Sequence, residues 1–471
     1  MKRVILMMMA AALAFACATP EPAPIAVQED ALSGTQGLAQ VLRGFHLFHH
    51  ETFDGNDRTC STCHTIPSFA LSIAQVQEEY ATDPSSALFR ALDSDAYDGA
   101  SYDLMREDGL VRVHVTLAPN VRVVSPPPDG TNVQLRPDGR YVVVFRRATP
   151  TSVNSALNEH LMLDGREGSN LAHQAMSAVN DHAQGRVPTA EESAAIAAFQ
   201  RTLFSSPALA AYAMGGPPPT LPRGRTASER RGRAFFESGP LSAAAGTHGL
   251  CATCHSGPMM NTTNEFNPGD PAGLRFTGNR TSEFNERALP VYTFEITAMT
   301  DLLNDNPNLG PMGVVRYPAG TVFTVTSPDP GVIVVDDPRD GFQDTNGDGE
   351  ADGYATPCFS MAGCAIFDDP SNPPALPNSG VAFHRVSTLW GVRHTAPYFH
   401  DNSAATLEDA ARHYVAFFGP TQQSMLAQAA FFESTGDPQL AQIAAMLRDM
   451  AAALVITEQD VQDIAAYMRL L

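Results

Sequence analysis

Hydrophobic and polar residues follow a helical period near both ends of the chain and a strand-like period in two stretches between them. Over residues 189–204 and 457–471 apolar side chains recur at helical spacing, and each stretch opens on a threonine. Thr189 is followed three residues later by Glu192, which is the spacing of a capping box. The pattern therefore predicts a helix over each stretch.

Two stretches, at about 76–146 and 285–380, break the helical pattern and contain runs of β-branched residues. The expected strands are Val111–Val115 and Gly139–Phe145, paired as a hairpin, and Thr321–Thr326 and Gly331–Val335. Residues 214–222 are rich in Gly and Pro and predict a linker. The predicted fold class is mainly α, with β-rich insertions.

Composition excludes one large class of partner. The chain has 471 residues, 51 acidic and 30 basic side chains, and a net charge of −21. Lys2 is its only lysine. Binding a phosphate backbone requires clustered cations, so we expect no nucleic-acid partner.

The N-terminus predicts export. Lys2 and Arg3 precede an uncharged apolar run, residues 4–16, that is too short to span a bilayer. Residues 1–17 are therefore read as a signal peptide, and the Pro-rich residues 18–35 as a tether. Cys17 leaves two alternatives open, ordinary cleavage after an A-x-A triplet or a lipid-bearing cysteine that anchors a bacterial lipoprotein. The expected location is the periplasm or the outer membrane.

Two C-x-x-C-H motifs carry the strongest chemical signal. Their residues are Cys60, Cys63 and His64 in the first and Cys251, Cys254 and His255 in the second. Two thiols on one turn can each add to a vinyl group of one haem, and the following His is then placed as an iron ligand. The alternative, one zinc site built from the four thiols, does not explain why both motifs end in His. The motifs predict two covalently attached c-type haems.

The motifs also divide the chain. Arg43-Gly44 precedes the first and Arg231-Gly232 the second, each at the start of a similar lead-in, and Thr226 begins the second lead-in with a capping box. We expect two haem domains, 36–225 and 226–471, each holding one of the two β-rich insertions. Both lead-ins look like the N-terminal helix of a small cytochrome c, and 457–471 resembles the helix that crosses it.

A third segment adds a family resemblance. Residues 393–414 read RHTAPYFHDNSAATLEDAARHY. Together with the haem motifs, this segment resembles the di-haem cytochrome c peroxidase family, which includes the MauG-type enzymes. Thr395 to Asp401, including His400, matches the family's T-x-P-Y-F-H-D segment, and Asp164-Gly165-Arg166 with Gln174 matches its D-G-R…Q segment.

The resemblance implies one peroxide-reactive haem and one six-coordinate electron-relay haem in the C-terminal domain. The relay ligand falls on Tyr414, where the peroxidases have Met and the MauG-type enzymes have Tyr. His413 and Met425 are alternative ligands, and Tyr414 could instead be a core aromatic on a helix over 406–418. Trp390, the only tryptophan, could carry electrons between the haems or simply fill the core.

The peroxide side departs from the family. Leu163 stands where the family usually has Trp. The position of the family's catalytic Glu falls near Gln184, whose amide does not titrate near neutrality. His182, two residues away, is either the distal acid or base or a sixth ligand, unless it faces solvent in a loop. His46, His49 and His50 are further candidate distal ligands, although closely spaced histidines are usually exposed.

Calcium ligands and a disulfide are expected in the second insertion. Oxygen-bearing side chains recur at the spacing of a calcium loop, at Asp344, Asn346, Asp348, Glu350 and Asp352. The twelfth position is Ala355, so an acidic turn without metal is the alternative. The resemblance implies a second calcium between the haems, bound by Thr395 and Pro397, although Ala148 replaces its Asn.

Cys358 and Cys364 are the cysteines that remain once Cys17 and the haem thiols are assigned. An exported chain permits their pairing, so we expect a local disulfide.

Together these features predict an exported di-haem oxidoreductase that reduces hydrogen peroxide with electrons from a small donor protein, a cytochrome c or cupredoxin, passing from the second haem to the first. One alternative is MauG-like oxidation of a protein or organic substrate through high-valent iron. The other is an electron-transfer lipoprotein without catalysis. The acidity of the chain favours a basic donor.

Overall fold

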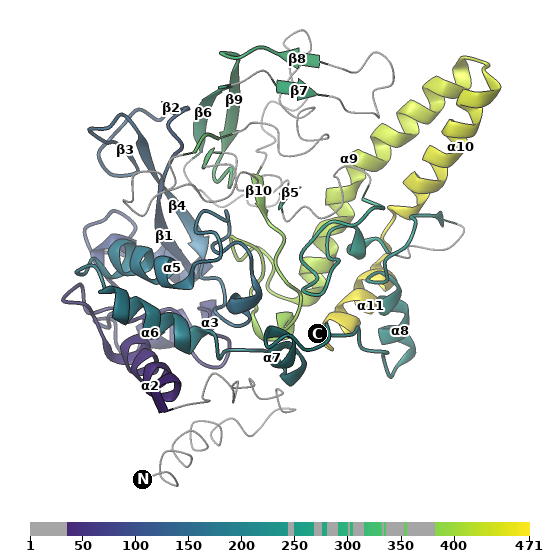
Figure 1. The fold of residues 1–471 in the computed structure, drawn as a ribbon. Coiled ribbons are helices and arrows are strands. Elements are labelled where there is room, and N and C mark those ends of the chain that lie inside the picture. The colour runs from purple at the N-terminus through teal and green to yellow at the C-terminus, as the bar shows by residue number, and fades with distance from the viewer. Residues whose placement is uncertain are drawn as a thin grey trace.

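The computed structural model of the chain describes residues 35–243, 249–267, 276–279, 291–299, 302–304, 315–331, 334–335, 353–355 and 382–471 (Figure 1). The helices are α2 (Thr35–His50), α3 (Ile73–Thr82), α4 (Asp103–Asp108), α5 (Leu171–Ala178), α6 (Ala190–Gln200), α7 (Pro207–Ala213), α8 (Ala227–Ala234), α9 (Leu407–Ser434), α10 (Pro438–Ala453) and α11 (Glu458–Met468). Helices predominate, and the described strands lie only within 110–148 and 276–385, so the mainly α class with β-rich insertions is confirmed. The division into two haem domains stays a prediction.

In the N-terminal half, α2 packs across α6 (Figure 1). Thr189 and Glu192 form the predicted capping box at the start of α6, which ends at Gln200 rather than at residue 204. The two helices approach closely at Gly44, where an added Cβ would lie 1.9 Å from the carbonyl oxygen of Ala195.

The C-terminal half repeats this crossing with α8 and α11. Thr226 caps α8 with the predicted capping box, and Thr457 caps α11 in the same way. A Cβ at Gly232 would lie 1.9 Å from the carbonyl oxygen of Asp463, the same distance as at Gly44. The Arg-Gly pair of each lead-in therefore marks a glycine that lets a later helix pack against it.

The close crossing predicts a cost for any side chain at Gly44. A Gly44→Ala substitution is expected to destabilise the protein by about 1–3 kcal/mol, because α6 must move away from α2. The shift in the urea denaturation midpoint, followed by circular dichroism, measures this cost.

Gly239 provides the control for this substitution, since nothing lies within 4 Å of a Cβ placed there. Gly239→Ala should change stability by less than about 0.5 kcal/mol. Equal stability of both variants would contradict the close crossing of α2 and α6.

The strands are β1 (Leu110–Thr116), β2 (Val121–Ser125), β3 (Val133–Leu135), β4 (Tyr141–Ala148), β5 (Phe276–Asn279), β6 (Tyr292–Thr297), β7 (Leu302–Asn304), β8 (Val315–Tyr317), β9 (Val322–Ser327) and β10 (Ala382–Arg385). They form four antiparallel sheets among the described residues, with strand orders β1-β4-β3, β2-β6-β9, β10-β5 and β7-β8. β1 and β4 pair as predicted, with Val113 opposite Phe145, but β2 and β3 lie between them in sequence. The prediction of a strand over 331–335 is wrong for the described residues Val334 and Val335, which do not lie in a strand.

The two insertions share one sheet and one core. β2 belongs to the first insertion, yet it pairs with β6 of the second, with Val121 opposite Ile296. Side chains from both insertions pack together in a single buried cluster that also contacts Cys63. The sequence places these insertions in separate domains, whereas tertiary structure joins them beside the first C-x-x-C-H motif.

The long helix α9 continues beyond its predicted end at residue 418 and packs against α10 (Figure 1). In the described part of the chain no single helix is long and apolar enough to cross a membrane. α10 and α11 reach that threshold only when taken together, and they meet at a bend of 65°.

Candidate functional site

The first C-x-x-C-H motif begins on a short 3₁₀ turn, Cys60–Thr62. His64 follows, and its Nδ1–H donates to the carbonyl oxygen of Phe69 at 2.8 Å. The hydroxyl oxygen of Ser152 lies 3.2 Å from the same nitrogen. Because Nδ1 is engaged, the Nε2 lone pair is left to bind a metal, which is the usual arrangement of a histidine ligand.

The second motif repeats this local structure. It begins on a 3₁₀ turn, Cys251–Thr253, and the Nδ1–H of His255 donates to the carbonyl oxygen of Met260 at 3.0 Å. In both motifs the acceptor is therefore the carbonyl five residues after the histidine. Burial lowers the pKa of both His64 and His255, so both rings are neutral and able to ligate.

The thiols of Cys60, Cys63 and Cys251 are weak acids. Burial raises the pKa of Cys60 to about 12 and that of Cys63 to about 11, and it raises the pKa of Cys251 further still. Thiols of this kind are poor thiolate nucleophiles, which disfavours a disulfide-exchange role. The described cysteines form no disulfide.

One zinc site built from the four thiols is not formed. In the described ranges, three potential ligand atoms from His, Cys, Asp or Glu come within 4.8 Å of one another at one place, and no cysteine belongs to it. The donor sets of the two motifs instead fit two separate haems, each with two thiols and one neutral imidazole.

Tyr414 on α9 lies against the second motif. Its side chain packs in the same buried cluster as Cys251. Burial raises the pKa of the Tyr414 phenol, and the nearby sulfur atoms of Cys254 and Cys251 add to this effect. The phenol of Tyr414 therefore lies near the thiols of the second motif.

His413, the alternative ligand, packs beside Tyr414, and their ring centroids lie 5.3 Å apart. Its ring centroid lies 4.6 Å from that of Phe399, and the charge that acts on it is that of Asp401. Met425 is buried on the same helix, eleven residues after Tyr414, which corresponds to about 16 Å of helix. The identity of the relay ligand stays a prediction, and Tyr414 is the candidate whose phenol interacts with the thiols of the second motif.

His182 lies on a π-helical turn, Val179–Ala183, that continues α5. Such turns widen a helix locally and are frequent at functional sites. Burial lowers the pKa of His182 to about 4, and the carboxylates of Asp181 and Asp93 oppose this effect only in part. The ring is therefore neutral at physiological pH.

A buried ion pair connects His182 with the first motif. Arg58 NH2 lies 2.7 Å from Asp93 Oδ2, and both side chains are buried. The Arg58 NH1 group donates to the backbone oxygen of His182 at 3.4 Å. The same pair acts electrostatically on the thiol of Cys63, so His182 and the first motif share one neighbourhood.

The two glutamines have different surroundings. Gln184 is exposed, and its amide oxygen accepts a hydrogen bond from Asn56 at 3.2 Å. Gln174 is partly buried on α5, where its amide nitrogen lies 3.8 Å from the sulfur of Met162. Between these two candidates, Gln174 is the better shielded from solvent.

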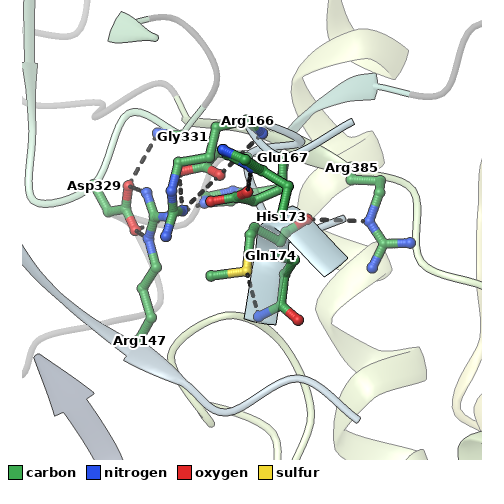
Figure 2. A network of polar contacts seen from close by, with 11 residues as sticks. Arg147, Arg166, Glu167, His173, Gln174, Asp329, Gly331 and Arg385 are labelled. Carbon is green, nitrogen blue, oxygen red and sulfur yellow. Dashed lines mark hydrogen bonds and ion pairs between the residues drawn. The ribbon is translucent and has the colours of Figure 1, made fainter. Parts of the chain in front are cut away.

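Around Gln174 extends a polar network that the sequence does not predict (Figure 2). Arg147 at the end of β4 binds both carboxylate oxygens of Asp329, at 2.6 and 2.9 Å, and contacts Asp164 at 2.5 Å. Arg166 also binds Asp164, at 2.8 Å. Burial alone would raise the pKa of Asp164, but the two guanidinium groups lower it to about 2. The D-G-R segment is thus held by a buried, charge-balanced cluster.

The same network contains an acid–histidine pair. The Nδ1 atom of His173 lies 2.6 Å from Glu167 Oε2, and both residues are largely buried (Figure 2). Neither residue was a candidate from sequence. A spacing of six residues between Glu167 and His173 does not indicate a site in the sequence. The two side chains meet because of the turn that precedes α5.

Trp390 lies between segments that belong to the two motifs. Its indole N–H donates to the carbonyl oxygen of Pro258, three residues after His255, at 2.9 Å. Its own carbonyl accepts from Asn154 at 3.0 Å, two residues after Ser152, which contacts His64. This placement fits either of the predicted roles of Trp390.

Among the histidines of α2, His49 contacts the first motif, because its backbone oxygen accepts a hydrogen bond from the Ser61 hydroxyl at 3.4 Å. Its Nε2 atom is buried without a hydrogen bond among the described residues. His46 and His50 are exposed, and their ring centroids lie 5.1 Å apart. His49 packs among Phe45, Phe48 and Phe199.

The segment that ends in His400 lies beside Ala148, as the resemblance implies. The backbone N–H of Ala148 donates to the carbonyl oxygen of His400 at 2.6 Å. Thr395 donates its hydroxyl to the carbonyl oxygen of Val392 at 3.0 Å, and Pro397 follows two residues later. A calcium ion bound by Thr395 and Pro397 stays a prediction.

Several predicted residues lie outside the described part of the chain. They are Cys17, the calcium-loop residues Asp344, Asn346, Asp348, Glu350 and Asp352, and the cysteines Cys358 and Cys364. Export, lipidation, a calcium ion in this loop and a disulfide therefore stay predictions.

Comparison with known proteins adds little to this geometry. No family model matches the chain, and no curated protein matches it. Among solved structures, a similar chain is described as a MauG-like protein associated with microbial copper homeostasis, with 16% identity over 97% of this chain and 95% of that chain and a TM-score of 0.38. A likeness this distant establishes neither a family nor a function for the chain.

Proposed function

We propose that this chain is an exported oxidoreductase that carries two c-type haems and reacts with hydrogen peroxide. The observation that carries the proposal is the repeated geometry of the two C-x-x-C-H motifs. In each, a 3₁₀ turn presents two thiols, and the histidine donates Nδ1–H to the carbonyl five residues later. A pattern that recurs in both sequence and structure is hard to explain without a shared ligand.

Each motif contributes the same set of roles. Cys60 and Cys63 would hold one haem by thioether bonds, and Cys251 and Cys254 the other. His64 and His255 would each bind iron through Nε2, while the carbonyl acceptor of Nδ1–H fixes the ring and increases its basicity. Haem bound in this way supplies an iron centre that exchanges single electrons and binds peroxide.

His182 would handle the proton at the first motif. Since burial keeps its imidazole neutral, it can accept a proton from hydrogen peroxide as the peroxide binds. Arg58 and Asn56 support this role, because both hydrogen-bond the backbone oxygen of His182 and so fix the π-helical turn. His182 takes the place of the absent glutamate in this proposal.

Tyr414 would be the sixth ligand at the second motif. A phenolate oxygen is a hard donor that stabilises the oxidised state of iron and lowers its reduction potential. This placement specifically favours the second candidate function, in which the protein oxidises a protein or organic substrate with peroxide. Donor-dependent peroxide reduction remains the first candidate, with Trp390 on the route between the motifs and a basic cytochrome or cupredoxin as donor.

The proposal is tested by counting haems on the purified, exported protein. The pyridine haemochrome spectrum should give two haems per chain, and Cys60→Ser/Cys63→Ser should give one. Tyr414→Phe should retain two haems but alter the ferric absorption and EPR spectra of one of them. A wild-type chain without covalent haem would overturn the proposal.

A further inference from the structure

Asp329, His384 and His400 meet at a buried point that the proposed haem chemistry does not use. Asp329 follows β9, His384 lies in β10, and His400 precedes α9, so three separate segments contribute. One ligand atom from each residue lies within 4.8 Å of the other two. All three residues are buried, with relative exposures of 3%, 8% and 7%.

Among the described residues, both ring nitrogens of His384 are buried without a hydrogen bond of normal length. The carboxylate of Asp329 interacts with the ring, but its Oδ2 atom lies 3.8 Å from Nε2. A buried polar group without a close partner is costly, so this imidazole indicates a ligand that the described residues do not supply.

The separation of the donor atoms fits a metal better than a hydrogen bond. His384 Nε2 lies 3.8 Å from Asp329 Oδ2, which exceeds hydrogen-bonding distance. Two ligands that each lie about 2.1 Å from one tetrahedral zinc ion are about 3.4 Å apart. The observed 3.8 Å would therefore close by about 0.4 Å on binding, and the widest separation in the group by at most about 1.4 Å.

The two imidazoles are arranged to act together. Their ring centroids lie 4.2 Å apart with an interplanar angle of 21°. Burial, with His384 adding to it, lowers the pKa of His400 to about 4, so the ring is neutral and its lone pair is available. The hydrogen bond from Ala148 N–H to the His400 carbonyl anchors this residue to β4.

Arg147 does not block the carboxylate. A carboxylate offers about four lone-pair positions. Arg147 NH2 and the N–H of Gly331 use those of Oδ1, whereas Oδ2 accepts only from Arg147 Nε among the described contacts. The positive charges of Arg147 and Arg166 are balanced by Asp164 and Asp329, and Arg147 orients Asp329 as the partners of metal ligands commonly do.

We propose that Asp329, His384 and His400 bind one divalent transition-metal ion, with zinc as the reference ion. Two imidazoles and one carboxylate are donors for zinc-class ions, whereas calcium takes oxygen ligands only. The ion would join β10, the segment after β9 and the segment before α9. This site differs from both predicted calcium sites in its residues and in its chemistry, and it does not depend on haem.

The test is a zinc titration of the full-length, haem-loaded protein, produced without a polyhistidine tag and first treated with a chelator. The titration contains excess calcium, which occupies oxygen-rich sites, and a chromophoric chelator, which competes with the protein for zinc. One tight zinc equivalent is expected for the wild type. His384→Phe and His384→Gln should each weaken that equivalent by at least about 100-fold.

Two further measurements exclude other sites. His46→Ala/His50→Ala removes the exposed pair on α2, whose i, i+4 spacing can chelate zinc, and it should retain the tight equivalent. Zinc-edge X-ray absorption, which does not detect haem iron, should show imidazole nitrogen and carboxylate oxygen ligands at about 2.0–2.2 Å.

The proposal is overturned if the wild type has no tight zinc equivalent, or if both His384 variants retain it. Loss of that equivalent from the α2 variant would also overturn it. Haem content is measured separately on every sample, so failure of the haem proposal can be told apart from failure of the metal site.

Discussion

His182→Gln is expected to slow the reaction of the ferric protein with hydrogen peroxide by about 10²–10⁴-fold. The substitution keeps a polar side chain of similar reach but removes the group that accepts the peroxide proton. Stopped-flow absorption of the haem band measures the rate directly. Because burial lowers the pKa of His182 to about 4, the wild-type rate should be level near neutral pH and fall as the pH drops through about 4.

His114→Gln is the matched control for this variant. His114 lies on β1, is also partly buried, and also feels the charges of Asp181 and Asp93. His114→Gln should change the peroxide rate by no more than about twofold, because it disturbs the same region but leaves the proposed proton acceptor in place.

The ferric spectrum separates the two roles proposed for His182. If His182 is a sixth ligand, His182→Gln shifts one haem to high spin and accelerates the reaction. An unchanged spectrum together with an unchanged rate would refute both roles.

Arg147→Met is expected to destabilise the folded protein by about 3–5 kcal/mol. It leaves Asp164 and Asp329 buried, with relative exposures of 0% and 3%, and removes the cation that they share. The shift of the urea denaturation midpoint, measured with a chelator present so that metal uptake does not contribute, tests this loss.

The pH dependence of stability provides a second readout. The pKa of Asp164 is about 2 in the folded protein, below its ordinary value of 3.8. A lowered carboxyl pKa stabilises the folded state above pH 3.8, and this contribution is lost as the pH falls from 3.8 towards about 2. Without Arg147 this acid-dependent loss should become smaller, because the pKa of Asp164 then rises.

Arg122→Met provides the comparison with a surface ion pair. Arg122 binds Glu295 at 2.9 Å, but its side chain is 63% exposed. Such a pair contributes about 0–1 kcal/mol, because water and salt screen both charges. Equal losses in the Arg147 and Arg122 variants would show that the buried network does not hold the D-G-R segment.

Local features of the fold are readable from sequence because a few neighbouring residues decide them. Capping boxes at Thr189 and Thr226, and the apolar period that begins after Thr457, predict three helix starts, and each is confirmed. The hairpin prediction succeeds only in part. Nothing near Val121 in sequence indicates that β2 pairs with β6, about 170 residues later, because the partner of a strand is chosen by the packing of the whole sheet.

At the candidate functional site, too, some features depend on local spacing and others on tertiary packing. The motifs identify His64 and His255 as ligand candidates, since their spacing from the thiols is set within one turn. The sequence does not show what Tyr414 contacts, whereas the packing of α9 places it in one cluster with Cys251. Arg58 and Asp93, 35 residues apart, meet only in the tertiary structure.

By itself, the sequence determined the two thiol–histidine motifs, the helices that flank them and the mainly α class, because each depends on residues within a few turns of one another. The tertiary structure alone decided which side chains gather around those motifs. It placed Tyr414 beside the second, connected His182 to the first through a buried ion pair, and brought Asp329, His384 and His400 together. Those contacts join distant segments, and the burial of apolar surface, rather than local spacing, sets which segments meet.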